Sequence, residues 1–394
     1  MTTIILKKGK QESLLRRHPW LFSGAIHHAT GTEPEEGDIV DVRSAEGDFL
    51  GRGICSLGSI AVRILTFEDE PIDQQWWNRQ IAAAYELRKN LGLAASATTT
   101  CYRLVHGEGD NLPGLIVDIY GTTAVMQAHT LGIYLNRETI VAALCAVLDE
   151  KLTAIYDKSS GTLPSASGVE AMDGYLFGEA SSQNILENGH RFLANWADGQ
   201  KTGFFLDQRD NRALVAHYAR GRKVLNTFCY TGGFSVYALA AGAMAVDSVD
   251  SSAKAISLTD KNTELNFGNC ANHRSYVSDT MDFLRDMPAG EYDLVILDPP
   301  AFAKHQKALG NALQGYKRLN ARAMEKMPRG SILFTFSCSQ AVSGEQFRMA
   351  VFSAAALARR NVRILHQLTQ PADHPINIYH PEGEYLKGLV LYID

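Results

Sequence analysis

The sequence predicts an α/β fold in which a seven-stranded, mostly parallel sheet follows a small β-barrel and a small central α+β domain. The stretch Val224 to Asp250 has the pattern of a buried strand, a glycine turn, a short apolar helix and a second strand that ends in an acid. Strands and helices then alternate, and strand ends at 226, 250, 279, 298 and 338 are expected at one edge of the sheet. The first 72 residues are instead short β-type runs separated by glycine, which is typical of a small barrel.

The stretch Val224 to Asp250 has the features of a nucleotide-type site. An apolar strand precedes Gly232 and Gly233, which let the backbone approach a ligand, and the helix that follows stops at Gly242. Asp250 follows Gly232 by 18 residues, about the spacing at which an acid on the second strand reaches ribose hydroxyls. Because the GxGxxG fingerprint of dinucleotide sites is absent, S-adenosylmethionine (SAM) is the favoured ligand. The alternative is a turn that merely closes a βαβ unit.

Composition is that of a globular protein, with 394 residues, 45% hydrophobic and 21% charged. This length predicts two or three domains. Six cysteines without CxxC or CxxH spacing, and the lack of a signal-peptide pattern, predict a cytoplasmic protein. No apolar run approaches the roughly 18 residues that span a bilayer, so no membrane partner is expected.

The net charge of −5 argues against general affinity for nucleic acid, so any RNA contact should be local. One candidate surface, the basic strip, gathers five basic side chains near the amino terminus beside the single acid Glu12. It consists of Lys7, Lys8, Lys10, Arg16 and Arg17. The alternative is an ordinary solvated face.

Three domains are expected: a barrel at 1–72, a linker helix with a central α+β domain at 73–183, and the large sheet at 184–394. In the linker helix, Trp76 and Trp77 favour packing over base stacking. A loop of the central domain contains His106, Glu108 and Asp110, for which turn formation is favoured over a metal site. An Asn-Gly pair at 188 and 189 predicts a hairpin.

The Asp298 loop follows an apolar strand and contains Pro299, Pro300, Ala301 and Phe302. Two prolines fix the backbone and leave carbonyl groups facing the site. A similar Asp-Pro-Pro-aromatic tetrad in amine-directed methyltransferases holds a base amino group, with the aromatic ring stacked on the base. The loop alone would therefore indicate methylation of a base nitrogen, but Ala301 interrupts the tetrad.

Cys338, in Phe-Ser-Cys-Ser at another strand end, favours a different chemistry. Carbon 5 of cytosine becomes nucleophilic only after a thiolate adds to carbon 6. Cys229 is the rival thiol, interpreted as packing against the cofactor side of the sheet. His374, between Asp373 and Pro375, is open to two interpretations, a base or a structural hydrogen-bond donor.

Two family resemblances add to these inferences. HPWLFSGAI, GDIVDV and FLGRGICS resemble the PUA domain, a small RNA-binding barrel. GQKTGFFLDQR, NTFCYTGGFSV, SVDSSAKAI, LDPPAF, FSCS and EGEYLKG, in this order over the whole chain, resemble the ribosomal RNA large subunit methyltransferase I family. Where that family has lysine in its Asp-Pro-Pro loop, this chain has Ala301.

The resemblance implies a class I SAM-dependent methyltransferase with a Rossmann-like sheet that makes 5-methylcytosine in 23S ribosomal RNA, leaving S-adenosyl-L-homocysteine. Cys338 would be the nucleophile, Asp298 would contact the base and lie beside SAM, and Pro299, Pro300 and Phe302 would contact the substrate. The implied cofactor residues are Gln208, Asn226, Phe228, Tyr230, Gly232, Gly233, Asp250, Asp279 and Asp298. Methylation of a base nitrogen and a non-catalytic RNA-binding assembly factor stay as alternatives, and a homodimer is left open.

Overall fold

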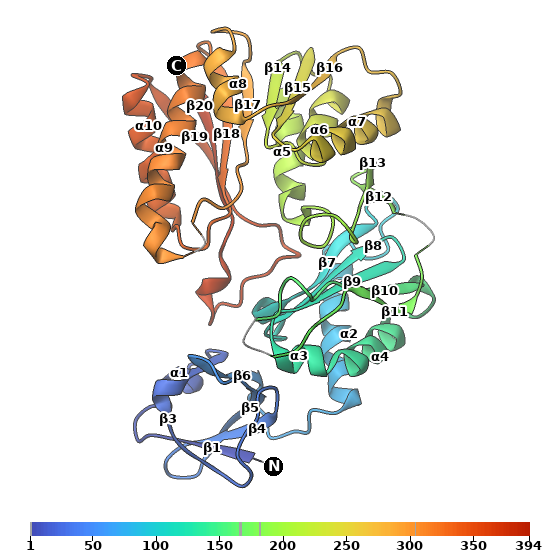
Figure 1. The fold of residues 1–394 in the computed structure, drawn as a ribbon, viewed down its shortest axis with the longest axis vertical. Helices are drawn as coiled ribbons and strands as arrows, with labels where there is room; N and C mark the ends of the chain where they lie inside the picture. Colours follow the sequence, from blue (N-terminus) through green and yellow to red (C-terminus); the bar gives the residue numbers. More distant parts are fainter. Residues whose placement is uncertain (1, 165–167, 181–182, 304) are drawn as a thin grey trace. The chain divides into compact units, whose positions relative to one another are not determined.

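The computed structural model describes residues 2–164, 168–180, 183–303 and 305–394. The chain divides into two compact units and passes between them repeatedly (Figure 1). Unit 1 comprises 1–185, 194–206 and 372–383, and unit 2 comprises 186–193, 207–371 and 384–394. Among the described residues, no helix is both long and apolar enough to cross a membrane.

The first sheet of unit 1 has six strands in the order β2-β6-β5-β4-β1-β3. Only the pairing of β1 with β4 is parallel. Alternate side chains of these strands, such as Ile4, Val42 and Val62, bury one apolar core, as the predicted small barrel requires. The elements are β1 (Thr2–Leu6), α1 (Glu12–Leu15), β2 (Trp20–Phe22), β3 (Ile26–Thr30), β4 (Ile39–Arg43), β5 (Phe49–Cys55) and β6 (Ile60–Thr66).

The second sheet of unit 1 has five strands in the order β11-β10-β9-β8-β7. Trp76 and Trp77 are 0% and 1% exposed, which confirms their predicted packing role, and the core around them also contains Ile54 and Leu65 of the first sheet. The elements are α2 (Gln74–Asn90), β7 (Cys101–His106), β8 (Leu115–Tyr120), β9 (Thr123–Ala128), α3 (Leu131–Leu135), α4 (Arg137–Leu148), β10 (Ala154–Asp157) and β11 (Gly174–Gly178).

The segment 372–383 belongs to unit 1, although it follows a strand of unit 2 in the sequence. The Asp373 carboxylate accepts a hydrogen bond from the Arg103 backbone N–H at 2.9 Å, and its carbonyl accepts one from Arg88 Nη2 at 2.7 Å. His374 is 1% exposed, and its Nδ1 lies 3.2 Å from the Asp373 carboxylate. The structural interpretation of His374 is therefore the one that these contacts favour.

Unit 2 is built on a seven-stranded sheet in the order β16-β15-β14-β17-β18-β20-β19, in which β20 alone runs antiparallel to its neighbours. This confirms the predicted seven-stranded, mostly parallel sheet. The strands are β14 (Lys223–Thr227), β15 (Ala245–Asp250), β16 (His273–Val277), β17 (Leu294–Leu297), β18 (Ser331–Ser337), β19 (Val362–Leu368) and β20 (Lys387–Ile393). The helices are α5 (Arg209–Ala219), α6 (Gly233–Ala240), α7 (Ala253–Phe267), α8 (Thr280–Asp286), α9 (Leu309–Lys326) and α10 (Gly344–Leu357).

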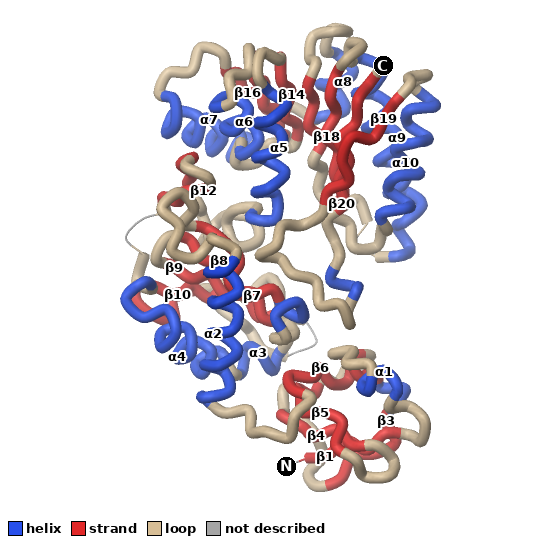
Figure 2. Tube along the Cα trace, turned by 180° about the vertical axis from the view of Figure 1, so that it is seen from behind, coloured by secondary structure: helices blue, strands red, loops and turns tan. Residues whose placement is uncertain are grey.

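Helices cover both faces of this sheet because its central strands are apolar on both sides. Val224 and Ile296 pack toward α5 and α6, whereas the neighbouring Leu225 and Leu297 pack toward α8, α9 and α10. Figure 2 shows the strands between these two groups of helices. The carboxyl ends of the parallel strands consequently remain free of helices and can carry loops.

The hairpin of β12 (Asn184–Glu187) and β13 (His190–Leu193) turns at Asn188 and Gly189. Their φ angles are 50° and 84°, the two positive values that a type I′ turn needs, so the Asn-Gly prediction is confirmed.

Candidate active site

The predicted strand-end residues gather in loops at the carboxyl edge of the large sheet. The loop after β14 is hydrogen-bonded to the end of β15, where Cys229 N–H donates to the Val249 carbonyl at 3.1 Å. The end of β15 is hydrogen-bonded to the loop after β16, where Ser278 N–H donates to the Asp250 carbonyl at 3.0 Å. Two neighbouring loops, after β17 and β18, carry Asp298 and Cys338.

The glycine turn after β14 is held in an unusual backbone conformation. Phe228, Tyr230 and Gly232 have φ angles of 54°, 45° and 72°, the left-handed region. A Cβ atom at Gly232 would lie 2.6 Å from Thr259 Cγ2, and one at Gly233 would lie 2.8 Å from Arg212 Cδ. A larger residue at either position would therefore collide with a side chain of α7 or α5, so the packing of these helices against the turn requires both glycines.

Asp250 is fixed by this turn. One carboxylate oxygen accepts the Tyr230 N–H at 3.1 Å, and the other accepts the Ser252 N–H at 2.9 Å. Each oxygen of a carboxylate can accept more than one hydrogen bond, so both keep capacity for hydroxyl donors of a ligand. Asp250 is half-buried at the end of β15, which keeps it within reach of such a ligand.

Other predicted cofactor residues have protein partners that the sequence did not indicate. Asp279 is exposed and caps α8, accepting from Met281 N–H at 2.8 Å. Asn226 is buried, its Nδ2 donates to Ser235 Oγ at 2.9 Å, and its Oδ1 has no hydrogen-bond partner among the described residues. Gln208 is 3% exposed.

The Asp298 loop begins half-buried and packs inward at its end. The Phe302 ring lies 4.7 Å from the Tyr316 ring of α9, and it fills the space beside Gly315. Pro299 is buried and Pro300 is exposed. One face of the Phe302 ring therefore packs against the protein, which limits the area of the ring that could stack on a base.

Cys338 lies against the Asp298 loop. Its Sγ is 3.9 Å from the Pro299 carbonyl oxygen, and the side chain is half-buried. The flanking serines point into the core, since Ser337 Oγ donates to the Tyr316 hydroxyl at 2.9 Å and Ser339 Oγ lies 3.0 Å from the same hydroxyl. Ser339 Oγ also accepts the Ala303 N–H at 3.3 Å, so the two loops are joined.

Cys229 has a different environment. Its side chain is 6% exposed, and Sγ lies 3.5 Å from Thr259 Oγ1. Burial raises the pKa of the Cys229 thiol to about 12, which keeps it protonated at neutral pH. These features agree with a packing role.

Sequence inspection missed Lys387, which lies in the apolar strand β20. Lys387 is 6% exposed, and its Nζ donates to the carbonyl oxygens of Ser339 and Tyr385 at 2.7 Å each. Burial lowers the pKa of Lys387 to about 8, against the opposing effects of the Cys338 and Glu384 charges. The only sequence signal was a lysine within an otherwise apolar strand.

The acids Glu108 and Asp110, for which the sequence favoured turn formation over a metal site, accept hydrogen bonds from other side chains of unit 1. Asp110 accepts from Arg88 Nη2 at 2.8 Å, and Glu108 accepts from Trp20 Nε1 at 2.9 Å.

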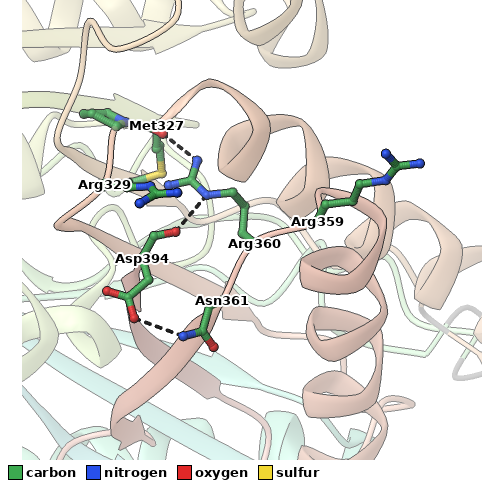
Figure 3. A pocket seen from close by; sticks show the side chains of 7 residues that line it. Met327, Arg329, Arg359, Arg360, Asn361 and Asp394 are labelled. Carbon is green, nitrogen blue, oxygen red and sulfur yellow. Dashed lines mark hydrogen bonds between the residues drawn. The ribbon is translucent and has the colours of Figure 1, made fainter.

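One cavity of about 730 Å³ lies away from this edge (Figure 3). It is lined by Arg329, Arg360 and Asp394 among others, next to the start of β18 and β19 and the end of β20. Arg360 is engaged there, donating to the carbonyls of Met327 and Asp394 at 2.7 and 3.1 Å. The cavity is at the amino ends of the parallel strands, opposite the loops that hold Asp250 and Cys338.

Comparisons with known proteins agree with this architecture. The family model of S-adenosylmethionine-dependent methyltransferases matches residues 164–378, and the PUA-like domain model matches residues 4–67. A solved structure of a protein described as a methyltransferase complexed with SAH superimposes with a TM-score of 0.85 at 26% identity, covering 99% of this chain and 100% of the other.

Two curated relatives are similar over almost their whole length. Ribosomal RNA large subunit methyltransferase I of Pseudoalteromonas atlantica is 42% identical, covering 98% of both chains. The protein of the same name from Shewanella denitrificans is 40% identical, again over 98% of both chains. This SAM-dependent methyltransferase, with its PUA-like amino-terminal domain, therefore belongs to the ribosomal RNA large subunit methyltransferase I family.

Proposed function

We propose that this protein methylates carbon 5 of a cytosine in 23S ribosomal RNA through a covalent adduct of Cys338. The observation that carries the proposal is the half-buried Cys338 thiol held 3.9 Å from the Pro299 carbonyl, in a loop bonded to the Asp298 loop. The names of the relatives support ribosomal RNA as the substrate, which implies a cytoplasmic reaction.

The residues after β14 and β15 fit SAM. The Asp250 carboxylate is oriented by two backbone N–H groups and keeps acceptor capacity for two ribose hydroxyls. The turn from Phe228 to Gly232, fixed by its left-handed residues, would border the same ligand. SAM, when bound, supplies an electrophilic methyl group.

Cys338 acts first in the proposed reaction. Its thiolate forms a bond to carbon 6 of the cytosine, and the electron pair of the carbon 5–carbon 6 double bond moves so that carbon 5 becomes nucleophilic. Carbon 5 would then accept the methyl group that SAM supplies, with S-adenosyl-L-homocysteine as the leaving group. A base removes the proton from carbon 5, the bond from sulfur to carbon 6 breaks, and the thiolate is regenerated.

Asp298 is proposed to contact the pyrimidine ring during these steps. Its half-buried position at the end of β17, next to the Pro299 carbonyl, gives an acceptor and a carboxylate beside Cys338. Such groups hold the amino group of cytosine and stabilise the ring when the thiolate adds.

Nucleoside mass spectrometry tests the proposal. Ribosomal RNA treated with the protein and isotopically labelled SAM should yield labelled 5-methylcytosine. A labelled N-methyl nucleoside would replace the proposal with methylation at nitrogen, and RNA binding with no labelled nucleoside would indicate an assembly factor.

A further inference from the structure

A buried lysine lies beside the turn that carries Cys338. Lys387 pairs with Ser337 in the antiparallel register of β20 and β18, one residue from the thiol in sequence. Directly paired residues of antiparallel strands have Cα atoms about 4.5 to 5.5 Å apart. Lys387 therefore reaches the Ser337–Ser339 turn from the neighbouring strand.

Two carbonyl groups fix the Lys387 ammonium. Nζ donates to Ser339 and Tyr385 at 2.7 Å each, which uses two of the three ammonium donors. The stem of the side chain runs past the start of α10, where a Cβ atom at Gly344 would lie 3.7 Å from Lys387 Cγ. The ammonium is therefore held in one place and is not a flexible surface charge.

Burial of this ammonium is unfavourable unless a negative charge lies nearby. The negative charges that favour its protonated form are those of the Cys338 thiolate and Glu384. Electrostatic coupling is reciprocal, so the Lys387 ammonium favours the Cys338 thiolate to the same extent. Glu384 contributes no nucleophile, which leaves Cys338 as the functional partner.

We propose that Lys387 is a positioning residue for Cys338, holding the Ser337–Ser339 turn through the Ser339 carbonyl and stabilising the thiolate by its positive charge. This inference rests on the proposed role of Cys338 as nucleophile. The thiol proton leaves to water, and Lys387 keeps its own proton when sulfur bonds to carbon 6. Lys387 thus acts through Cys338 and need not touch the substrate.

The pH dependence follows from the groups that face the turn. Lys387 on β20 is charged below its lowered pKa of about 8, so its stabilisation of the thiolate is present below that pH and is lost above it. Tyr316 on α9 stays neutral, because burial raises the pKa of its hydroxyl. The acidic side chains near the turn are Asp298, in the loop after β17, and Glu384, which precedes β20.

Three variants of the full-length protein test the inference. Lys387→Met removes the charge and the donors, Lys387→Gln removes the charge but keeps an amide donor for the carbonyls, and Lys387→Arg keeps the charge. Each is alkylated with iodoacetamide across a pH series, and modification of Cys338 is quantified by peptide mass spectrometry. Cys270, a half-exposed thiol with Asn272 as its neighbour, is the internal control.

The expected result is a pH midpoint for Cys338 alkylation that rises by about one unit or more in both neutral variants, with no change at Cys270. Lys387→Arg should stay near the wild-type midpoint. A merely structural lysine would lower the alkylation plateau or the stability in Lys387→Met without moving the midpoint in Lys387→Gln.

An unchanged midpoint in a folded Lys387→Gln protein would overturn the inference, whatever the role of Cys338. A raised midpoint in the Lys387 variants, combined with normal methylation by Cys338→Ala, would separate the two proposals. The coupling of Lys387 to Cys338 would then stand, whereas the covalent mechanism would be wrong.

Discussion

Arg212 donates two parallel hydrogen bonds to the Glu187 carboxylate, Nε to Oε1 and Nη2 to Oε2, each 2.7 Å long. The pair joins α5 to the end of β12, and the two side chains are 4% and 0% exposed. Tyr237 of α6 donates to the same Glu187 carboxylate at 3.0 Å. The carboxylate therefore links the hairpin to two helices on one face of the large sheet.

Removing one partner of this pair should destabilise unit 2 strongly. Arg212→Met leaves a buried carboxylate without its cation, and breaking a buried pair costs about 3 to 5 kcal/mol. Urea unfolding should show a clearly lower midpoint. Arg285→Met, which breaks an exposed pair with Asp286, is the matched control and should leave the midpoint unchanged. Equal midpoints for both variants would contradict this account.

Gly232→Ala should be destabilising for two reasons that can be separated. Alanine at a φ angle of 72° costs about 1 to 2 kcal/mol, and the new Cβ would lie 2.6 Å from Thr259 Cγ2. Thr259→Ser deletes that methyl group but keeps the hydroxyl that donates to the Tyr230 carbonyl at 3.0 Å. The double variant should recover part of the lost stability in urea unfolding. No recovery would mean that backbone strain alone sets the cost.

Asp250→Ala should weaken SAM binding. Hydrogen bonds to a charged group contribute roughly 1.5 to 3 kcal/mol, which corresponds to about a ten- to hundred-fold rise in the dissociation constant. Isothermal titration calorimetry measures this dissociation constant directly. Asp286→Ala, which removes an equal charge from the exposed surface of α8, should bind SAM as the wild type does. Unchanged affinity in folded Asp250→Ala would remove Asp250 from the cofactor site.

Cys338→Ala should abolish methyl transfer while leaving SAM binding intact, because loss of a nucleophile can cost on the order of 10⁶ in rate. Asp298→Asn keeps the thiol and should lose roughly 10² to 10⁴. Cys270→Ala serves as the control thiol substitution and should retain activity.

RNA that contains 5-fluorocytosine should trap the wild-type protein. Fluorine replaces the proton on carbon 5 that must be abstracted, so the adduct should survive denaturing electrophoresis. Cys338→Ala should form no adduct. An adduct that maps by peptide mass spectrometry to Cys229 would refute the assignment of the nucleophile.

The basic strip should contribute RNA affinity through phosphate contacts. Lys8 and Lys10 are exposed, whereas Lys7 donates to the Gly24 carbonyl at 3.0 Å and Arg17 lies 3.9 Å from Glu68. Replacing Lys8 and Lys10 by Gln should flatten the log-log salt dependence of RNA binding by about 0.7 to 0.9 per lost contact. Point variants suit this test better than deletion, because Ile54 and Leu65 pack in the core that contains Trp76.

Lys151→Gln with Lys261→Gln is the matched control, since both side chains are exposed and lie outside the strip. The control should keep the wild-type salt slope. An identical slope for all three proteins would locate the RNA surface elsewhere.

Local sequence patterns predicted much of the large sheet. Apolar runs, the Asn188-Gly189 turn and the Ser252 cap of α7 are determined by neighbours a few residues apart, so their patterns could be recognised. The Asp250 and Cys338 positions followed because parallel strands bring their carboxyl ends to one edge.

Other features depend on partners far apart in sequence. Lys387 meets Ser339 only through the register of β18 and β20, and Glu187 gives no sign of its pairing with Arg212. Neither residue type nor local periodicity carries information about such contacts before the tertiary structure forms.

The return of the chain to unit 1 at residues 372–383 has a consequence for biosynthesis. Residues 372–383 complete unit 1, and β20, which follows them, inserts between β18 and β19 of unit 2. A nascent chain emerges from the ribosome amino terminus first, so unit 1 stays incomplete until residue 383 has been made and unit 2 until β20 has been made up to residue 393. A stalled or truncated product that stops before residue 372 would lack a part of each unit.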